Sequence, residues 1–229
     1  MISEDCSNVR RKVRPNPLFG RPRRLERMFR RLLCRPYFHG KEFTTDWTSE
    51  HFALWHRVLA PLRNEPIRIL EIGSWEGRSA VFFLNFFRRS TIVCIDTFTG
   101  NVEEQTYKVI PTAGVELRFD RNLAQFRGRI EKIKSESRPA LEGLREQGRR
   151  FDLAYIDGNH RRDDVMADSL GVWPLLAIGG IVIWDDYTFA MDLPPEERAQ
   201  PAIDAFLDGH QGHLRLLAKT KQVIIERLD

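Results

Sequence analysis

The sequence predicts an α/β fold with a doubly wound, seven-stranded and mostly parallel sheet that has one antiparallel strand near the C-terminus. Three observations favour this fold. Apolar runs of strand length alternate with helical patterns from residue 49 to residue 208, as in successive βαβ units. The first run leads into a helix through a turn that contains glycines. The last two runs are separated only by residues 219–221, which suits an antiparallel hairpin.

The predicted strands are apolar runs of the length expected when helices cover both faces of a sheet. They span residues 67–73, 91–96, 130–135, 151–157, 180–185, 214–218 and 222–227. Helical periodicity fills the intervals between them. The predicted helices span residues 49–62, 77–88, 114–126, 139–147, 163–176 and 195–207. Because the final two strands form a hairpin, we expect the sheet to end with one reversed strand.

The net charge of +4 hides an uneven distribution along the chain. Residues 1–41 hold 12 Lys/Arg against 3 Asp/Glu, a balance of +9, which leaves 24 against 29, or −5, for residues 42–229. We therefore expect a basic N-terminal arm, residues 1–41, and one folded domain, residues 42–229. The acidic domain offers no extended basic groove, so no nucleic-acid partner is expected.

The arm contains a predicted short amphipathic helix with arginines between its apolar residues. These apolar residues are Leu25, Met28, Phe29, Leu32 and Leu33. Three roles fit residues 21–35, namely packing on the domain, a homodimer contact, or peripheral contact with a membrane surface.

Cysteine usage and hydropathy indicate a cytoplasmic protein, with peripheral membrane contact left open. No apolar run reaches the roughly 20 residues of a membrane span, and no secretory signal pattern opens the chain. The cysteines lack metal-binding spacing, and they are Cys6, Cys34 and Cys94. Cys94 lies in a predicted strand, where we expect it to be a buried, small apolar residue.

A strand–turn–helix segment near residue 70 has the features of a cofactor site. It reads Ile69-Leu-Glu-Ile-Gly-Ser-Trp-Glu-Gly-Arg-Ser79, and its two glycines let the backbone approach a bound cofactor. Asp96 ends the second strand 19 residues after Gly77, where a carboxylate can accept hydrogen bonds from ribose hydroxyls. Glu71 adds a negative charge that disfavours a pyrophosphate and favours a sulfonium cofactor with an ammonium group.

Together with Asp96, the segment Glu71-Ile-Gly-Ser-Trp-Glu-Gly77 resembles the first two motifs of class I S-adenosylmethionine-dependent methyltransferases. The resemblance implies a Rossmann-like fold and S-adenosyl-L-methionine as the cofactor. The residues expected to bind this cofactor are Glu71, Gly73, Ser74, Gly77, Ser79, Asp96, Thr97, Ser135 and Glu136. Ser135 and Glu136 are the pair expected near the adenine.

A group of acidic residues ends two later strands, in Phe151-Asp-Leu-Ala-Tyr-Ile-Asp-Gly-Asn-His160 and Gly179-Gly-Ile-Val-Ile-Trp-Asp-Asp-Tyr187. Parallel strands bring Asp157, Asp185 and Asp186 to one edge of the sheet, where clustered carboxylates favour a hard divalent cation. The segments resemble the metal-dependent O-methyltransferases, a branch that includes catechol-type enzymes and the macrocin O-methyltransferase and cephalosporin hydroxylase-like group. This resemblance implies that the three aspartates bind a metal, which we expect to be Mg²⁺.

His160 follows Asp157 by three residues, on the loop above the predicted metal. Histidine titrates near neutrality and can remove a proton from an acceptor hydroxyl, so His160 and Asp157 are the predicted catalytic residues. A capping or metal-ligating role for His160 is the alternative. Histidines without such neighbours are expected at the surface or in packing, and these are His39, His51, His56, His210 and His213.

The sequence therefore predicts an S-adenosylmethionine-dependent O-methyltransferase, assisted by a divalent metal, that acts on a hydroxyl of a small molecule or sugar. Two alternatives stay open, a metal-independent N- or O-methyltransferase and a non-catalytic cofactor-binding adaptor at a membrane. Hydroxylation is disfavoured because no 2-His-1-carboxylate iron triad is evident. Residues 43–47 and 97–112 are predicted lids. Trp184 and Tyr187 either line an acceptor pocket or belong to the core.

Overall fold

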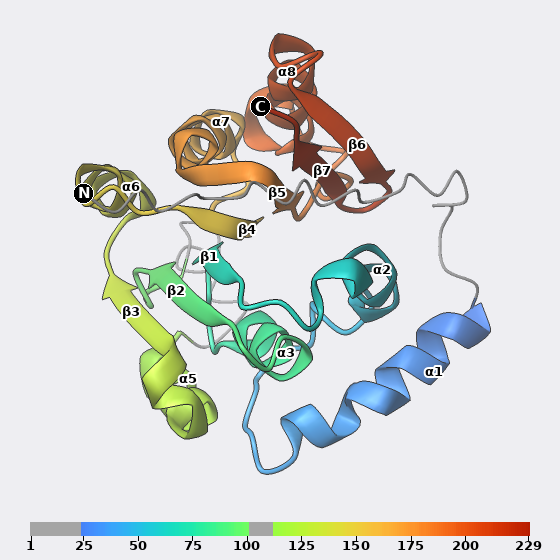
Figure 1. The fold of residues 1–229 in the computed structure, drawn as a ribbon, viewed down its shortest axis with the longest axis vertical. Coiled ribbons are helices and arrows are strands. Elements are labelled where there is room, and N and C mark those ends of the chain that lie inside the picture. Colours follow the sequence, from blue (N-terminus) through green and yellow to red (C-terminus); the bar gives the residue numbers. More distant parts are fainter. Residues whose placement is uncertain (1–23, 101–111) are drawn as a thin grey trace, which may run out of the picture.

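The computed structural model describes residues 24–100 and 112–229, and a seven-stranded sheet forms its centre (Figure 1). The strand order is β3-β2-β1-β4-β5-β7-β6. The strands are β1 (Arg68–Ile72), β2 (Thr91–Asp96), β3 (Ile130–Lys134), β4 (Phe151–Ile156), β5 (Leu176–Trp184), β6 (Leu214–Lys219) and β7 (Val223–Arg227). Neighbouring strands from β3 to β5 are parallel, whereas β7 is antiparallel to both β5 and β6. The predicted fold class is confirmed.

Helices cover the sheet in two layers, with α2, α3 and α5 on one face and α6, α7 and α8 on the other (Figure 1). The α-helices are α1 (Arg24–Cys34), α2 (Phe52–Val58), α3 (Arg78–Phe86), α5 (Val115–Leu123), α6 (Ser137–Glu146), α7 (Arg162–Val172) and α8 (Gln200–Gly209). Short 3-10 turns extend several of them, and these are Arg35–Phe38, Ala60–Leu62, Ala124–Arg129, Trp173–Leu175 and Pro195–Glu197.

The sheet separates two hydrophobic cores. Successive residues of β1, Ile69 and Leu70, enter opposite cores, because side chains of a strand alternate between its faces. The core beneath α2 and α3 is rich in aromatic rings, including Trp55 and Phe82, whose ring centroids lie 5.1 Å apart. Cys94 is fully buried in this core, as the sequence predicts.

One strand boundary and one strand position differ clearly from the sequence prediction. β5 begins at Leu176 rather than at residue 180, because Leu176 already pairs with Phe151 and a register shift in the ladder accommodates the glycines that follow. The reversed strand β7 lies between β5 and β6, so the prediction that it ends the sheet is wrong. The reason is burial, since β7 is almost entirely buried whereas the edge strand β6 is partly exposed.

The predicted helix of the N-terminal arm is present as α1, which packs against α2 at the periphery of the molecule (Figure 1). None of the helices in residues 24–100 and 112–229 combines the length and hydropathy of a membrane-spanning segment. Tyr37 and Phe38, which follow α1, are partly buried against the aromatic core. This contact joins the end of the predicted arm to the domain.

Candidate active site

The carboxyl ends of the central parallel strands meet at one edge of the sheet. Backbone hydrogen bonds continue the ladders beyond the strands, since Gly73 N donates to Ile95 O and Asp157 N donates to Ile72 O, each at 2.9 Å. A cavity of about 1250 Å³ opens at this edge. The predicted site residues that line it are Gly73, Asp96, Thr97, Ser135, Glu136, Asp157, His160, Asp185 and Asp186. The other predicted residues, Glu71, Ser74, Gly77 and Ser79, are buried behind this lining.

Gly73 allows close contact between the predicted cofactor segment after β1 and the predicted acidic segment after β4. Its φ angle is +81°, in the left-handed region, and a Cβ at this position would lie 1.9 Å from the backbone oxygen of Asp157. Glycine tolerates this conformation and leaves room for the neighbouring strand. The turn after β1 and the acidic loop after β4 can therefore lie in direct contact.

Asp96 is held in a fixed orientation at the cavity wall. Its carboxylate accepts hydrogen bonds from the backbone N–H groups of Trp75, at 2.7 Å, and Phe98, at 2.5 Å. Burial raises the pKa of Asp96, and these N–H groups oppose the rise. Trp75 has a φ of +47°, a strained conformation for a residue with a side chain. The strained turn presents its N–H to Asp96, which leaves this carboxylate pre-oriented for hydroxyl donors.

Unpartnered polar atoms behind the cavity fit a polar cofactor. Glu71 Oε1, Ser74 Oγ and Trp75 Nε1 are buried and have no hydrogen-bond partner within the described residues. Burial raises the pKa of Glu71 to about 7. Buried polar groups normally find a partner in the protein, in water or in a ligand. Together with the exposed edge of Asp96, these groups match the ammonium, ribose and carboxylate chemistry of S-adenosylmethionine.

A group of possible metal ligands lies on the same cavity wall. One ligand atom from each of Asp157, His160 and Asp186 lies within 4.8 Å of the other two. His160 Nε2 is 3.2 Å from Asp186 Oδ2, and His160 Nδ1 is buried without a partner among the described residues. Burial and then neighbouring aspartates raise the pKa of Asp157 well above its usual range and that of Asp186 to about 6. A divalent cation would relieve this repulsion, so the donor set fits one.

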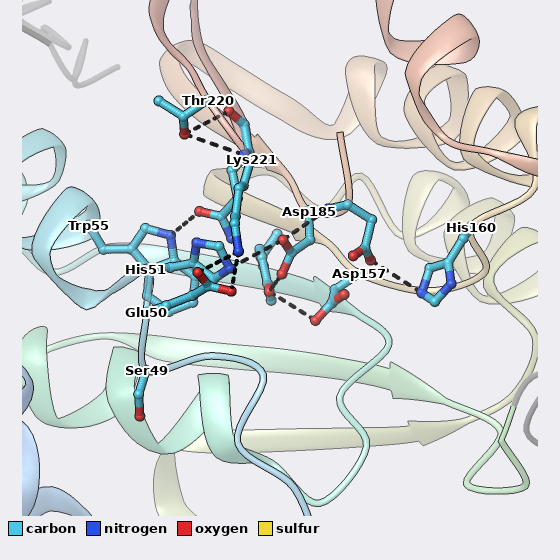
Figure 2. A network of polar contacts seen from close by, with 12 residues as sticks. Ser49, Glu50, His51, Trp55, Asp157, His160, Asp185, Thr220 and Lys221 are labelled. Atoms are coloured by element: carbon cyan, nitrogen blue, oxygen red, sulfur yellow. Dashed lines mark hydrogen bonds and ion pairs between the residues drawn. The ribbon is translucent and has the colours of Figure 1, made fainter. Parts of the chain in front are cut away.

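Asp185 is not a member of this group of three, although it lies close to it. Its carboxylate accepts a hydrogen bond from the Tyr155 hydroxyl, which also lies 2.9 Å from Asp157 Oδ2. On the other side, Asp185 Oδ1 is 3.6 Å from His51 Nε2. Figure 2 shows His51 on one side of these carboxylates and His160 on the other. The ligand set with Asp185 stays a prediction, and the geometry additionally offers His160 as a donor.

The cavity has a wall built from residues outside the predicted motifs, which we call the outer wall. It consists of Asp46, Trp47, Glu50, His51 and Lys221. Lys221 and Glu50 form an ion pair at 2.7 Å that ties the β6–β7 hairpin to the start of α2 (Figure 2). The Trp47 ring lies 6.0 Å from the ring of Trp75, measured between centroids. The outer wall therefore encloses the same space as the turn between β1 and α3, residues 73–77, which we call the cofactor turn.

Buried polar contacts hold residues 44–51, the segment that carries all of the outer wall except Lys221. Thr44 donates its backbone N–H and its hydroxyl to the buried carboxylate of Glu76, at 2.6 and 2.9 Å. Glu76 also pairs with Arg118. Arg78 lies 3.0 Å from Asp46 in an ion pair. These contacts fasten the segment to the turn after β1 and to the first residue of α3.

Sequence reasoning missed the position of His51. The sequence predicts a surface or packing residue, and His51 does pack on Trp55 with 8% exposure, but it also lines the cavity. No local pattern marks this position, because the contact with Asp185 joins residues far apart in the sequence. The core interpretation applies to Trp184, which donates to Ser169 at 2.8 Å and lies outside the cavity lining.

The two predicted lids lie near the cavity. Trp47 and the preceding Asp46 line it, and so do Thr97, Thr99 and Gly100. Residues 101–111 of the second segment fall outside the described residues. The closing movement of either segment stays a prediction.

Comparisons with known proteins agree with this architecture. A model of a methyltransferase domain family matches residues 70–187. The mycinamycin-pathway methyltransferase MycE, solved with Mg, SAH and mycinamycin VI, has a TM-score of 0.60 and 19% identity over 86% of this chain and 54% of that chain. The present chain thus spans about half the length of MycE. No curated protein matches the sequence.

Two further solved structures share the fold. The O-methyltransferase TomG from Streptomyces achromogenes, in complex with SAM, has a TM-score of 0.59 and 15% identity, covering 93% of both chains. The O-methyltransferase NovP has a TM-score of 0.50 and 18% identity, covering 72% of this chain and 73% of its own. The family match runs from within β1 to beyond the end of β5 and contains the residues of both predicted motifs from Leu70 onward. The chain therefore belongs to the methyltransferase domain family and shares its fold with these O-methyltransferases.

Proposed function

We propose that this methyltransferase transfers a methyl group from S-adenosylmethionine to a hydroxyl of a small molecule or sugar, with help from Mg²⁺. One observation carries the proposal, namely that the group of Asp157, His160 and Asp186 shares a single cavity with Asp96 and the cofactor turn. The O-methyltransferases with this fold support it, among them MycE, solved with Mg and SAH.

The protein's contribution to cofactor binding is a rigid, polar socket. Asp96 receives the ribose hydroxyls, while Ser135 and Glu136 lie at the cavity edge next to β3, where we place the adenine. Glu71 supplies a buried acidic group behind the turn. When bound, S-adenosylmethionine supplies an electrophilic methyl group. The socket fixes its position, and such positioning removes much of the entropic barrier of a two-reactant step.

The carboxylates after β4 and β5 would hold the metal. Asp157 and Asp186 provide oxygen donors, which Mg²⁺ prefers, and Asp185 is the third predicted ligand. A bound divalent cation supplies Lewis acidity toward an acceptor hydroxyl. The Tyr155 hydroxyl lies within hydrogen-bond distance of both Asp157 and Asp185, and this bridging contact fixes the spacing of the two carboxyl groups.

His160 is the proposed proton acceptor. The contact between Nε2 and Asp186 favours the tautomer that carries its hydrogen on Nε2, which leaves the lone pair of Nδ1 to accept a proton. The ring of Phe189 packs edge-on against His160, with 5.0 Å between the ring centroids, and restricts its rotation. His160 as a metal ligand is the alternative role.

The proposal is tested by methyl transfer from labelled S-adenosylmethionine to a panel of sugars, phenols and polyketide-like alcohols, with Mg²⁺ or with a chelator. We expect an O-methylated product that is lost with the chelator and lost in Asp157→Ala. Full turnover with the chelator would favour the metal-independent N- or O-methyltransferase. Cofactor binding without transfer to any acceptor, together with vesicle binding that deletion of residues 1–41 abolishes, would favour the adaptor.

The division into a basic arm, residues 1–41, and a domain, residues 42–229, is part of the same proposal, as is a cytoplasmic location. The contacts of Tyr37 and Phe38 with the aromatic core suggest that the arm is attached to the domain at its C-terminal end.

A further inference from the structure

The helix α1 presents an apolar face to solvent. Four of its large apolar side chains are about half exposed or more, and these are Leu25 (75%), Met28 (57%), Leu32 (51%) and Leu33 (47%). Isolated exposed leucines are ordinary at protein surfaces, but a contiguous apolar patch marks a site of interaction. Nothing in the cavity or in the proposed reaction uses this face.

The exposed side chains lie on one side of the helix. At about 100° per residue, Leu25, Met28 and Leu32 fall within about 60° of one another around the helix axis. Cys34 lies about 180° from Leu25, is 1% exposed, and contacts His56 of α2 at 3.3 Å. The helix therefore meets the domain through the side opposite its apolar stripe, and the stripe faces outward.

The composition of α1 identifies the occupant of this face. Arg24, Arg27, Arg30 and Arg31 accompany the stripe within eleven residues, against the single acidic residue Glu26. A short helix that combines an exposed apolar stripe with a clear excess of arginines is typical of helices that lie in the interface of an anionic bilayer. The stripe of one short helix falls well below the about 800 Å² per partner that a stable interface between two copies of the chain buries.

We propose that α1 docks on an anionic membrane surface, with Leu25, Met28 and Leu32 inserted among the lipids. The α1 helix lies at the periphery beside α2 (Figure 1), and none of its described residues lines the cavity. The active site therefore stays accessible when the helix is in the membrane. This arrangement places a methyltransferase at a lipid surface, where it meets acceptors dissolved in or attached to the bilayer.

The test is co-sedimentation of the full chain with vesicles of equal parts phosphatidylcholine and phosphatidylglycerol, and with vesicles of phosphatidylcholine alone. We expect binding to the anionic vesicles that weakens at high salt, and little binding to the neutral ones. Combining Arg24→Gln, Arg27→Gln and Arg31→Gln should lower partitioning about 100-fold. Combining Leu25→Gln, Met28→Gln and Leu32→Gln should lower it more than about tenfold, since apolar burial drives interfacial binding.

A matched control combines Leu117→Gln and Leu170→Gln, because both leucines are 53% exposed and lie on other helices. This control should bind vesicles as the unchanged chain does. S-adenosylmethionine binding by every variant verifies that the domain is folded. No binding to anionic vesicles, or equal loss in the control, would overturn the proposal. So would a dimer in sedimentation velocity that dissociates in the Leu25, Met28 and Leu32 variant, since it would make a second copy the occupant.

Discussion

At the scale of single residues, the site depends on carboxylates whose surroundings differ. Asp96 is held by two backbone N–H groups, whereas Asp157 lies among other acids. Glu71 is completely buried beside the thiol of Cys94, 3.4 Å away. The same functional group can therefore orient a ligand, attract a cation or store a proton, according to its neighbours.

Asp96→Asn should weaken S-adenosylmethionine binding strongly. A hydrogen bond to a charged group contributes about 1.5–3 kcal/mol, so titration calorimetry should show a loss of about tenfold to 100-fold in affinity. Asp152→Asn is the control, because Asp152 lies at the opposite end of the sheet, paired with Arg68. Unchanged affinity in Asp96→Asn would remove the ribose-binding role.

Glu71→Gln should change how stability depends on pH. Burial raises the folded-state pKa of Glu71 from 4.5 to about 7, so the folded protein binds a proton that the unfolded chain releases. Protonated Glu71 therefore adds to the unfolding free energy. This stabilisation is at most about 3 kcal/mol, is complete below about pH 4.5 and is lost as the pH rises to about 7.

Urea denaturation at pH 5 and pH 8 measures this difference. The unchanged chain should lose more unfolding free energy between the two pH values than Glu71→Gln, while the exposed Glu142→Gln should behave as the unchanged chain. Equal pH dependence in all three proteins would show that Glu71 is not protonated in the folded state.

The sequence predicts those site residues that follow strands, but not those that approach the cavity from elsewhere. Asp96, Asp157 and Asp186 follow apolar runs, so the parallel topology alone places them at one edge. His51 contacts Asp185 from the turn that precedes α2. Tyr155 lies in β4, where the sequence pattern predicts only a buried core residue and gives no sign of its contact with Asp185. Such contacts depend on tertiary packing, which the local pattern does not record.

At the scale of elements, the turn after β1 depends on the close approach of two backbones. Gly73→Ala should cost about 3 kcal/mol or more of unfolding free energy, because the new methyl group meets the Asp157 carbonyl and the φ angle is unfavourable. Gly179→Ala is the matched control, since Gly179 has a φ of +77° with nothing within 4 Å.

Gly179→Ala should lower the unfolding free energy by only about 1 kcal/mol, through backbone strain. Chemical denaturation compares the two variants. Similar losses of unfolding free energy in the two variants would indicate that backbone strain alone accounts for both. The backbone near Asp157 would then move easily to make room for the new methyl group.

Element types are predictable here because strands and helices differ in apolar period. β2 has the predicted bounds, since its run from Thr91 to Asp96 is bounded by polar residues. The start of β5 is less visible, because Pro174 interrupts the preceding helix and Gly179 and Gly180 interrupt the apolar run. The order of β6 and β7 depends on which strand loses more solvent contact, a property of the assembled sheet.

At the scale of the whole molecule, the possible metal ligands Asp157, His160 and Asp186 connect the loops that follow β4 and β5. A cation bound there should stabilise the folded chain, because it binds the native arrangement and not the dispersed carboxylates. At a concentration 100 times the dissociation constant the gain is about 2.7 kcal/mol. For a chain of this size the melting temperature should rise by about 5–10 °C.

Thermal unfolding with Mg²⁺ or Mn²⁺ measures this rise. Asp157→Asn should abolish it, whereas Asp120→Asn should retain it, because Asp120 lies outside the cavity and pairs with Lys132. An equal rise in both variants would place the cation elsewhere on this acidic domain.

The outer wall has a consequence for how such an enzyme changes over evolutionary time. Its residues, at 46–51 and at Lys221, lie on either side of the segment that the family shares, residues 70–187. The family segment and the outer wall thus occupy separate stretches of the chain. We expect that substitutions in the outer wall can change which acceptor is methylated while the family segment stays the same.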